Sequence, residues 1–221
     1  MRFTRTKAII IAAAAALLSA GLLIAATFAL FSDSVKTVNH LQAGTLDVSL
    51  YKISETGVIA DGNGIIPATA QTEDYSSSPI DLEASDASVF SLGNCVPGVW
   101  QEVTLQIVNN GTVAFDYSVS LVVTSELTGS AALLAEQLMV TVSDADGNAV
   151  VPAFSLAVAQ ERGEIALGSL TEANAASEFK VKVELPANES VLDSGAEGST
   201  IMGAQVDFDI SVKAQQKTEQ A

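Results

Sequence analysis

The sequence predicts an all-β protein built as an antiparallel β-sandwich, with one short helix and a long surface insertion, preceded by an N-terminal signal helix. Three observations support this prediction. Apolar and polar residues alternate in several short stretches, which is the period of a half-buried strand. Residues that form turns, mainly Asn, Asp, Gly and Pro, separate these stretches. Only one stretch has helical spacing, so we expect helices to contribute little.

The expected elements follow one another from Thr45 onward. Strands are predicted at 45–51, 88–92, 101–108, 115–123, 139–143, 149–157, 165–167, 178–185 and 203–213, and a helix at 127–138. Ser130 is the expected N-cap of the helix, because a serine hydroxyl can accept from the free N–H groups of a first turn. Residues 109–112, Asn-Asn-Gly-Thr, predict a hairpin turn, because Asn and Gly tolerate the positive φ of tight turns.

The stretch between the first two strands has no clear periodicity. It contains turn chemistry in Asp-Gly-Asn-Gly at 61–64, in Pro67 and in Tyr-Ser-Ser-Ser-Pro at 75–79. We therefore predict a long surface insertion over 55–85, with room for one weak hairpin. Loops of this length in compact domains usually carry a function or are partly disordered.

Composition and charge limit the class of protein. A chain of 221 residues fits one domain, here predicted over 42–213 and followed by a polar C-terminal tail at 214–221. The formal net charge is −16, and removal of a leader that carries three of the ten basic residues leaves 7 basic and 26 acidic residues, or −19. This excess argues against nucleic acid as a partner, because phosphates require cations. The negative charge is consistent with a soluble protein surface, or with a surface that attracts cations.

The N-terminal region is typical of an export signal. A basic start, MRFTRTK, precedes 19 residues from Ala8 to Ala26 that only Ser19 and Gly21 interrupt. The small residues near its end favour a signal peptide over 1–29, with Thr27 and Ala29 at the −3 and −1 positions and Leu30 as the new N-terminus. The alternative is a retained N-terminal anchor, since the run is long enough to span a membrane.

Two motifs resemble a known family. The segment 27–48 reads T-F-A-L-F-S-D-S-x(4)-N-x(3)-A-G-T-L-D-V, and 96–112 reads V-P-G-V-W-Q-E-V-T-L-Q-I-V-N-N-G-T. Both are similar to the TasA/camelysin (CalY) family, Gram-positive exported proteins that a dedicated signal peptidase, SipW, processes. The resemblance implies a jelly-roll-like sandwich, a SipW-dependent signal peptide and a location at the cell surface or in the extracellular matrix.

The resemblance also implies a function. TasA-like subunits assemble head-to-tail into biofilm-matrix fibres, because the freed N-terminal segment of one subunit completes a sheet of the next. The corresponding donor-strand segment here is 30–41, which contains no Pro or Gly and offers Phe31, Val35 and Val38 as apolar anchors. The implied partners are other copies of the chain, a SipW-like signal peptidase and a second TasA-like matrix protein.

Two other functions remain open. The first is a camelysin-like cell-surface metalloendopeptidase, and the second is a monomeric secreted or surface module that binds a partner through 55–85. A hydrolytic zinc site usually contains several His ligands, whereas this chain has one, His40, and no HExxH motif. Cys95 is the single cysteine, so it cannot form an intrachain disulfide. We therefore expect no catalytic residues.

One sequence motif is a candidate site for a metal other than zinc. The alternation of Asp144, Asp146 and Asn148 resembles the start of a calcium loop. However, the glycine comes two places early and the distal Glu of an EF-hand is missing, so a hairpin turn is the preferred interpretation. We expect no bound cofactor, with calcium at this turn as the alternative.

Overall fold

A computed structural model describes residues 32–34, 45–61, 65–84, 88–90, 92, 96–187, 201 and 204–217. The chain divides into two compact units, 1–32 and 33–221, and the second unit contains the domain described below. The predicted signal peptide lies outside the described residues. Within the described ranges, no helix has the length and apolar character needed to cross a membrane.

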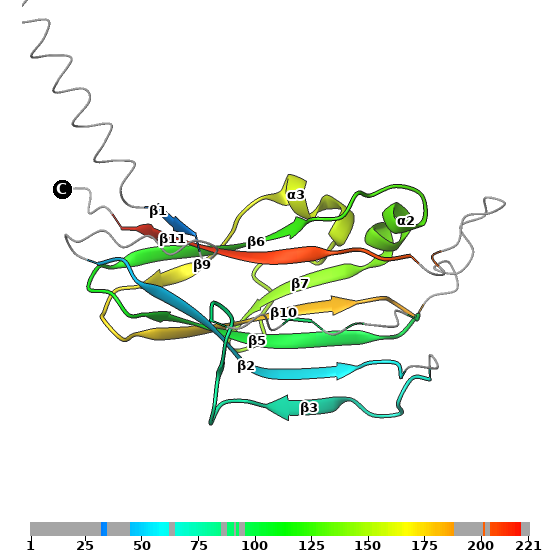
Figure 1. Ribbon diagram of the computed structural model, residues 1–221, viewed down its shortest axis with the longest axis horizontal. Helices are drawn as coiled ribbons and strands as arrows, with labels where there is room; N and C mark the ends of the chain where they lie inside the picture. The colour runs from blue at the N-terminus through cyan, green and yellow to red at the C-terminus, as the bar shows by residue number, and fades with distance from the viewer. Residues whose placement is uncertain are drawn as a thin grey trace, which may run out of the picture. The chain divides into compact units, whose positions relative to one another are not determined.

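The domain is an antiparallel β-sandwich of two sheets (Figure 1). The smaller sheet has the order β1 (Ser32–Ser34), β11 (Phe208–Gln216), β6 (Phe115–Val123) and β9 (Ile165–Leu170). The larger sheet has the order β3 (Gln71–Asp74), β2 (Val48–Val58), β5 (Trp100–Asn109), β10 (Ala176–Glu184), β7 (Met139–Asp144) and β8 (Phe154–Ser155), and β4 (Ile80–Asp81) also pairs with β2. The prediction of an all-β sandwich is confirmed.

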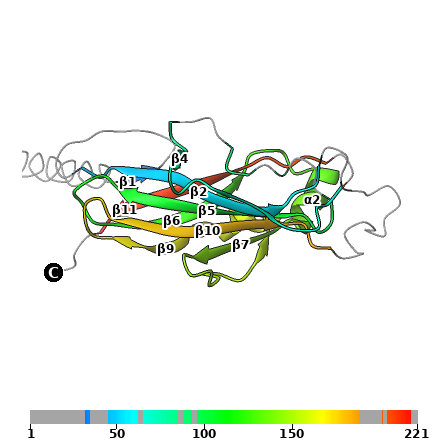
Figure 2. The same cartoon turned by 90° about the horizontal axis from the view of Figure 1, so that it is seen from below.

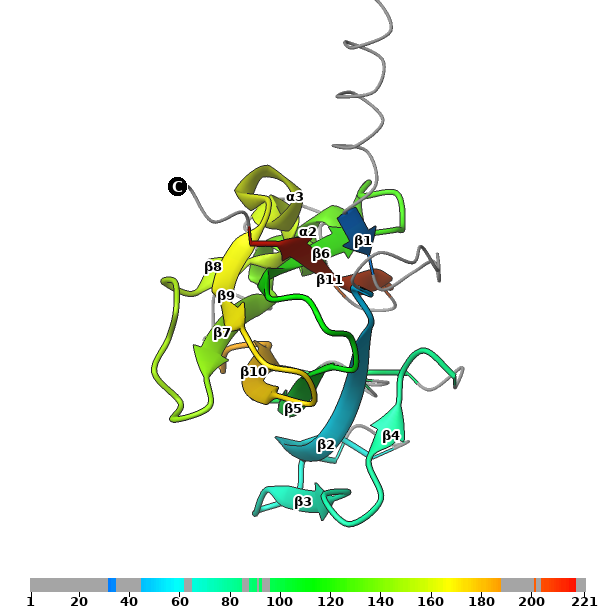
Figure 3. The ribbon, with the colours of Figure 1, turned by 90° about the vertical axis from the view of Figure 1, so that its left-hand side faces the viewer.

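The chain crosses repeatedly between the two sheets. The chain passes from β5 of the larger sheet to β6 of the smaller one, returns to β7 and β8, crosses again to β9, returns to β10 and crosses to β11. Figure 3 looks along the strands and shows the two layers, with β11 and β6 above β2, β5 and β10. This alternation is the connectivity expected of a jelly-roll-like sandwich.

The core lies between the sheets and follows the predicted alternation. Val103, Leu105 and Ile107 on β5 are fully buried. On β10, Val181 pairs with Val103 and Phe179 pairs with Leu105, so the apolar residues of both strands point to the same face. A period of two residues per strand places every second side chain in the core, which is why the sequence pattern predicts these two strands well.

The strand ends define two poles of the sandwich. At the first pole, Val48 pairs with Asn109 and Gln216 pairs with Phe115. At the second pole, Trp100 pairs with Val58 and with Glu184, and Phe208 pairs with Val123. Figure 2 shows the strands running between these poles, with α2 at the second.

The predicted hairpin at 109–112 is wrong, because β5 and β6 lie in different sheets. The segment instead crosses between the sheets and binds the chain that enters β2. The N–H groups of Asn110 and Gly111 both donate to the Asp47 carbonyl, at 2.8 and 3.1 Å. A Cβ on Gly111 would lie 1.9 Å from the Thr45 carbonyl oxygen, so glycine is required here for close backbone approach.

β2 is longer than the predicted strand 45–51 and continues into the predicted insertion as far as Val58. Its pairing with β5 shifts between Lys52 and Ser54, which indicates a bulge. An extra residue reverses the inward and outward positions of all later residues, so the alternation breaks although the strand continues. β3 and β4 then pair with the opposite edge of β2, so the insertion carries strands of its own.

Three local predictions differ from the structure. The described residues of 88–92 form no strand, because β3 and β4 already occupy the free edge of β2. Helix α2 spans Ser130–Gln137, and its N-cap is Gly129 with φ 55°, not Ser130. A short 3₁₀ turn, Leu156–Val158, and a one-turn helix, α3 (Ala159–Arg162), follow β8 without an amphipathic repeat long enough to be recognised.

Candidate functional site at the β11 edge

The edge of the smaller sheet beside β11 is the candidate site. β11 pairs with β6 along all nine of its residues. On its other side, the only strand among the described residues is β1, which has three residues. A strand of that length can pair with only part of β11, so β1 covers only part of this edge.

The inner face of β11 changes along the strand. Val212 and Ala214 are fully buried, whereas Phe208 and Ile210, nearer the second pole, are half-buried. The four residues alternate with polar ones, which explains why the segment forms a strand with one apolar face. An added strand that placed apolar side chains beside Phe208 and Ile210 would therefore complete the core at this end.

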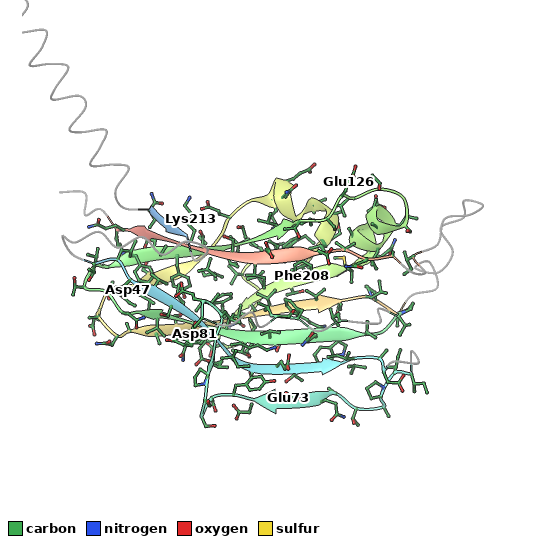
Figure 4. The ribbon with its side chains drawn as sticks, in the orientation of Figure 1. Asp47, Glu73, Asp81, Glu126, Phe208 and Lys213 are labelled. Atoms are coloured by element: carbon green, nitrogen blue, oxygen red, sulfur yellow. The ribbon has the colours of Figure 1, made fainter. Side chains whose placement is uncertain are left out.

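β11 is held in place by contacts that do not involve β1. Before the strand, the Thr124 N–H donates to the Asp207 carbonyl at 2.9 Å, and after it the Lys217 N–H donates to the Ala114 carbonyl at 3.0 Å. On the outer face, Lys213 forms an ion pair of 2.8 Å with Glu164, and this hydrogen bond lowers the pKa of the Glu164 carboxyl. The pair is solvent-exposed and contributes about 0–1 kcal/mol. Figure 4 shows Lys213 at the same end as Asp47.

Among the described residues between β4 and β5, Leu82, Val89, Phe90 and Leu92 are half-buried and pack against the core as a cover. The Phe90 ring packs against that of Phe208, with 5.7 Å between the centroids and a tilted angle of 42°. The Lys52 Nζ donates to the Val89 carbonyl at 3.1 Å. The cover is thus attached both to the first residue of β11 and to the interior of β2.

A buried polar cluster on the inner face of the larger sheet anchors this region. Lys52 forms an ion pair of 2.7 Å with Glu55, and their side chains are only 6% and 17% exposed. The fully buried Gln101 donates from Nε2 to the same Glu55 oxygen, Oε2, at 2.6 Å. Burial works to raise the pKa of the Glu55 carboxyl, but the hydrogen bond from Lys52 and the further donors outweigh it, so the pKa is lowered.

Tyr75 connects the cluster to the strand β3. Its hydroxyl contacts Glu55 Oε1 at 2.9 Å and also contacts Glu73 Oε2, and its ring lies 5.8 Å from the Lys52 ammonium. The neighbouring carboxylates, Glu73 first, raise the pKa of the Tyr75 hydroxyl above its usual 10.0. Because Glu55 lies on β2 and Tyr75 directly follows β3, the contact between these two side chains fastens the insertion to the sandwich.

The sequence pattern could have revealed part of this cluster. Lys52 stands at an inward position of the alternation that begins with Val48 and Leu50. A charged residue on an apolar face usually has a buried partner. The partners themselves could not be identified, because the bulge hides the inward position of Glu55.

The candidate calcium loop forms a hairpin turn after β7. The Asp144 carboxylate accepts from the Asn148 backbone N–H at 2.8 Å and from its side-chain amide at 3.1 Å. The side-chain amide is the main cause of the lowered pKa of Asp144, followed by the backbone N–H. Gly147, with φ 87°, completes the turn. The carboxylate therefore serves as a turn-closing acceptor.

Beside this turn lies a hollow of about 170 Å³. Tyr117, Leu167 and Phe179 line it, and Asp144 and Glu178 bring carboxylates to it. Throughout the described ranges, no three His, Cys, Asp or Glu side chains are arranged to hold a metal ion.

Most residues singled out in the sequence lie outside the described residues. They are the cleavage residues Thr27, Ala29 and Leu30, the donor-strand anchors Phe31, Val35 and Val38, and also His40 and Cys95. Of the donor segment 30–41, only Ser32–Ser34 is described, as β1 beside β11.

Comparison with known proteins supports the resemblance. Residues 4–68 match the model of a family described as camelysin metallo-endopeptidase. The match covers most of the predicted leader, the junction motif and β2, and it confirms the resemblance to the TasA/camelysin family. No curated protein matches the chain.

Proposed function

Given the camelysin-family match over residues 4–68, we propose that this protein is an exported, TasA-like structural subunit that assembles head-to-tail into extracellular biofilm-matrix fibres. The observation that carries the proposal is the β11 edge. It is a nine-residue strand, fixed by β6, whose other side faces only the three-residue β1 among the described residues. A longer strand from another copy can therefore replace β1.

The donor would be the segment 30–41 of a neighbouring copy. Residues 30–40 are eleven residues without Pro or Gly, which is enough to pair along all nine residues of β11. Burying Phe31 and Val35 would contribute about 1.5–3 kcal/mol each. Backbone pairing adds roughly 0.5–1.5 kcal/mol net per hydrogen bond, against about 1–2 kcal/mol for ordering each residue. The balance therefore depends on the apolar anchors.

Cleavage after Ala29 would control assembly. While the leader remains, the donor segment is tethered to the export site and cannot reach a neighbour. Removal of the leader by a SipW-like signal peptidase frees Leu30 and the residues after it. Head-to-tail insertion does not close on itself, so the product is a filament at the cell surface or in the extracellular matrix. A second TasA-like matrix protein could provide a matching edge.

The test compares mature chains that differ only in the donor segment. A chain that starts at Gln42, or one that carries Phe31→Asp with Val35→Asp, should stay monomeric in size-exclusion chromatography and keep its β-rich circular dichroism. The matched control is Val150→Asp, a similar change at a residue that is 39% exposed on the hairpin after β7. If the donor-segment variants form fibres as the parent does in electron microscopy, donor-strand assembly is wrong.

The family description favours a second candidate, a metalloendopeptidase. The described residues provide no set of three ligands for the metal that such an enzyme needs. His40 lies outside them. Casein hydrolysis that a chelator abolishes and zinc restores, in the purified mature protein, would support this candidate. Unchanged hydrolysis in His40→Ala would remove its single histidine from consideration.

A further inference from the structure

Two adjacent isoleucines are exposed in the connection between β2 and β3. The side chains of Ile65 and Ile66 are 64% and 40% exposed, and we call this pair the isoleucine tip. Its backbone is held by Asp61: the Asp61 N–H donates to the Ile65 carbonyl at 3.0 Å, and the Ile65 N–H donates to the Asp61 carboxylate at 2.8 Å. The apolar pair is therefore presented in a fixed position.

The tip lies at the second pole. A Cβ placed on Gly98 would lie 3.7 Å from Ile66 Cδ1, and the Gly98 N–H donates to the Leu185 carbonyl just after β10. Figure 1 shows the connection between β2 and β3 at the right-hand end, where β5 begins. The chain that enters β2 lies at the opposite, first pole, where the Thr112 N–H donates to the Thr45 carbonyl at 2.9 Å.

If donor-strand assembly holds, the topology determines which surfaces of two copies meet. β11 runs from the second pole to the first, so an antiparallel donor strand runs toward the second pole and leaves the sheet there. After residues 30–40 have paired, only 41–44 remain before Thr45 of the donor copy. Four residues span at most about 14 Å. The first pole of the donor copy must therefore lie close to the second pole of the acceptor copy.

We infer that the isoleucine tip is a second contact between successive copies, and that it packs against the first pole of the next copy. This inference rests on the proposed fibre function and adds a second interface to it. The first pole offers a suitable surface, because Leu46 and Val113 are half-buried beside the exposed Thr112. Apolar contact there would remove from water the side chains that the single copy leaves exposed.

Crosslinking tests which poles meet. The test variant is a mature chain that carries Cys95→Ser together with Ile65→Cys and Thr112→Cys. Electron microscopy first establishes that it forms fibres, and the fibres are then treated with a short bis-maleimide. The control pair is Val150→Cys with Thr112→Cys, since Val150 has nearly the exposure of Ile66 but lies on the hairpin after β7. The tip pair should give a ladder of covalent multimers, with about tenfold more crosslinked chain than the control, because neighbouring thiols react at a raised effective concentration.

A substitution gives an independent measurement. Ile65→Asp with Ile66→Asp should raise the concentration needed for fibre growth by about tenfold, while the control Val150→Asp leaves it unchanged. Fibres without a ladder, together with unchanged growth of the Asp variant, would overturn the inference and leave donor-strand assembly intact. Absence of fibres from the parent chain would instead refute the proposed function, and this inference with it.

Discussion

Replacing Lys52 by Met tests whether the buried cluster on β2 stabilises the fold as an ion pair. The change keeps a chain of similar length and removes the ammonium that Glu55 and the Val89 carbonyl both contact. Breaking a buried ion pair costs about 3–5 kcal/mol, whereas an exposed pair contributes about 0–1 kcal/mol. With side chains 6% and 17% exposed, this pair is near the buried limit, so we expect a loss of about 3 kcal/mol.

The assay is urea unfolding, followed by circular dichroism, of the truncated chain that starts at Gln42. A loss of this size lowers the midpoint of thermal unfolding by roughly 6–12 °C for a chain of this length. Glu55→Gln should cost a similar amount, because it leaves the Lys52 ammonium buried without its counter-ion. The double variant should cost no more than either single one, since neither charge remains, and the coupling energy of the cycle is about 3 kcal/mol.

The same cluster predicts a pH dependence. The folded state lowers the pKa of Glu55 below its ordinary value of 4.5, so its contribution to stability is present above that value and is lost as the pH falls through the lowered pKa. The Glu55→Gln variant should lack this part of the acid sensitivity. Single variants that each cost less than about 1 kcal/mol, with no coupling between them, would refute the ion-pair reasoning, because exposed pairs behave in that way.

Three further predictions concern turns. Gly111→Ala should cost about 3 kcal/mol in urea unfolding, because a Cβ there meets the Thr45 carbonyl at 1.9 Å and the backbone has to move; an effect below about 1 kcal/mol would show that the approach is not tight. Asn109→Ala should cost about 2–4 kcal/mol in the same assay, because this fully buried side chain donates to the Val113 and Glu172 carbonyls and accepts from the Gly111 N–H. Asn148→Ala should raise the pKa of Asp144 toward its ordinary 3.8, because the side-chain amide is the main cause of the lowering; a carboxyl titration by NMR that is unchanged from the parent would contradict this.

The sequence by itself determined the local features of this protein. Alternation identified β5, β10 and the inward residues of β11, because a strand on a packed sheet must place every second side chain in the core. The junction motif at 27–48 indicated the resemblance to the TasA/camelysin family, which the family-model match over residues 4–68 supports, because such a motif is read from local sequence and requires no fold.

Tertiary structure decided which strands pair and what the irregular residues do. Asn110 and Gly111 have the composition of a hairpin turn, yet β5 pairs with β2 and β10, and the glycine serves an approach to Thr45 from a distant part of the chain. The residues of a turn favour a local bend of the chain. Which sheet the next strand joins is decided by the burial of the apolar faces of the two sheets against each other. Lys52 and Glu55 meet on the inner face only because a bulge changes the phase of β2. In the sequence, the extra residue only interrupts the alternation, and this interruption looks the same as the end of a strand.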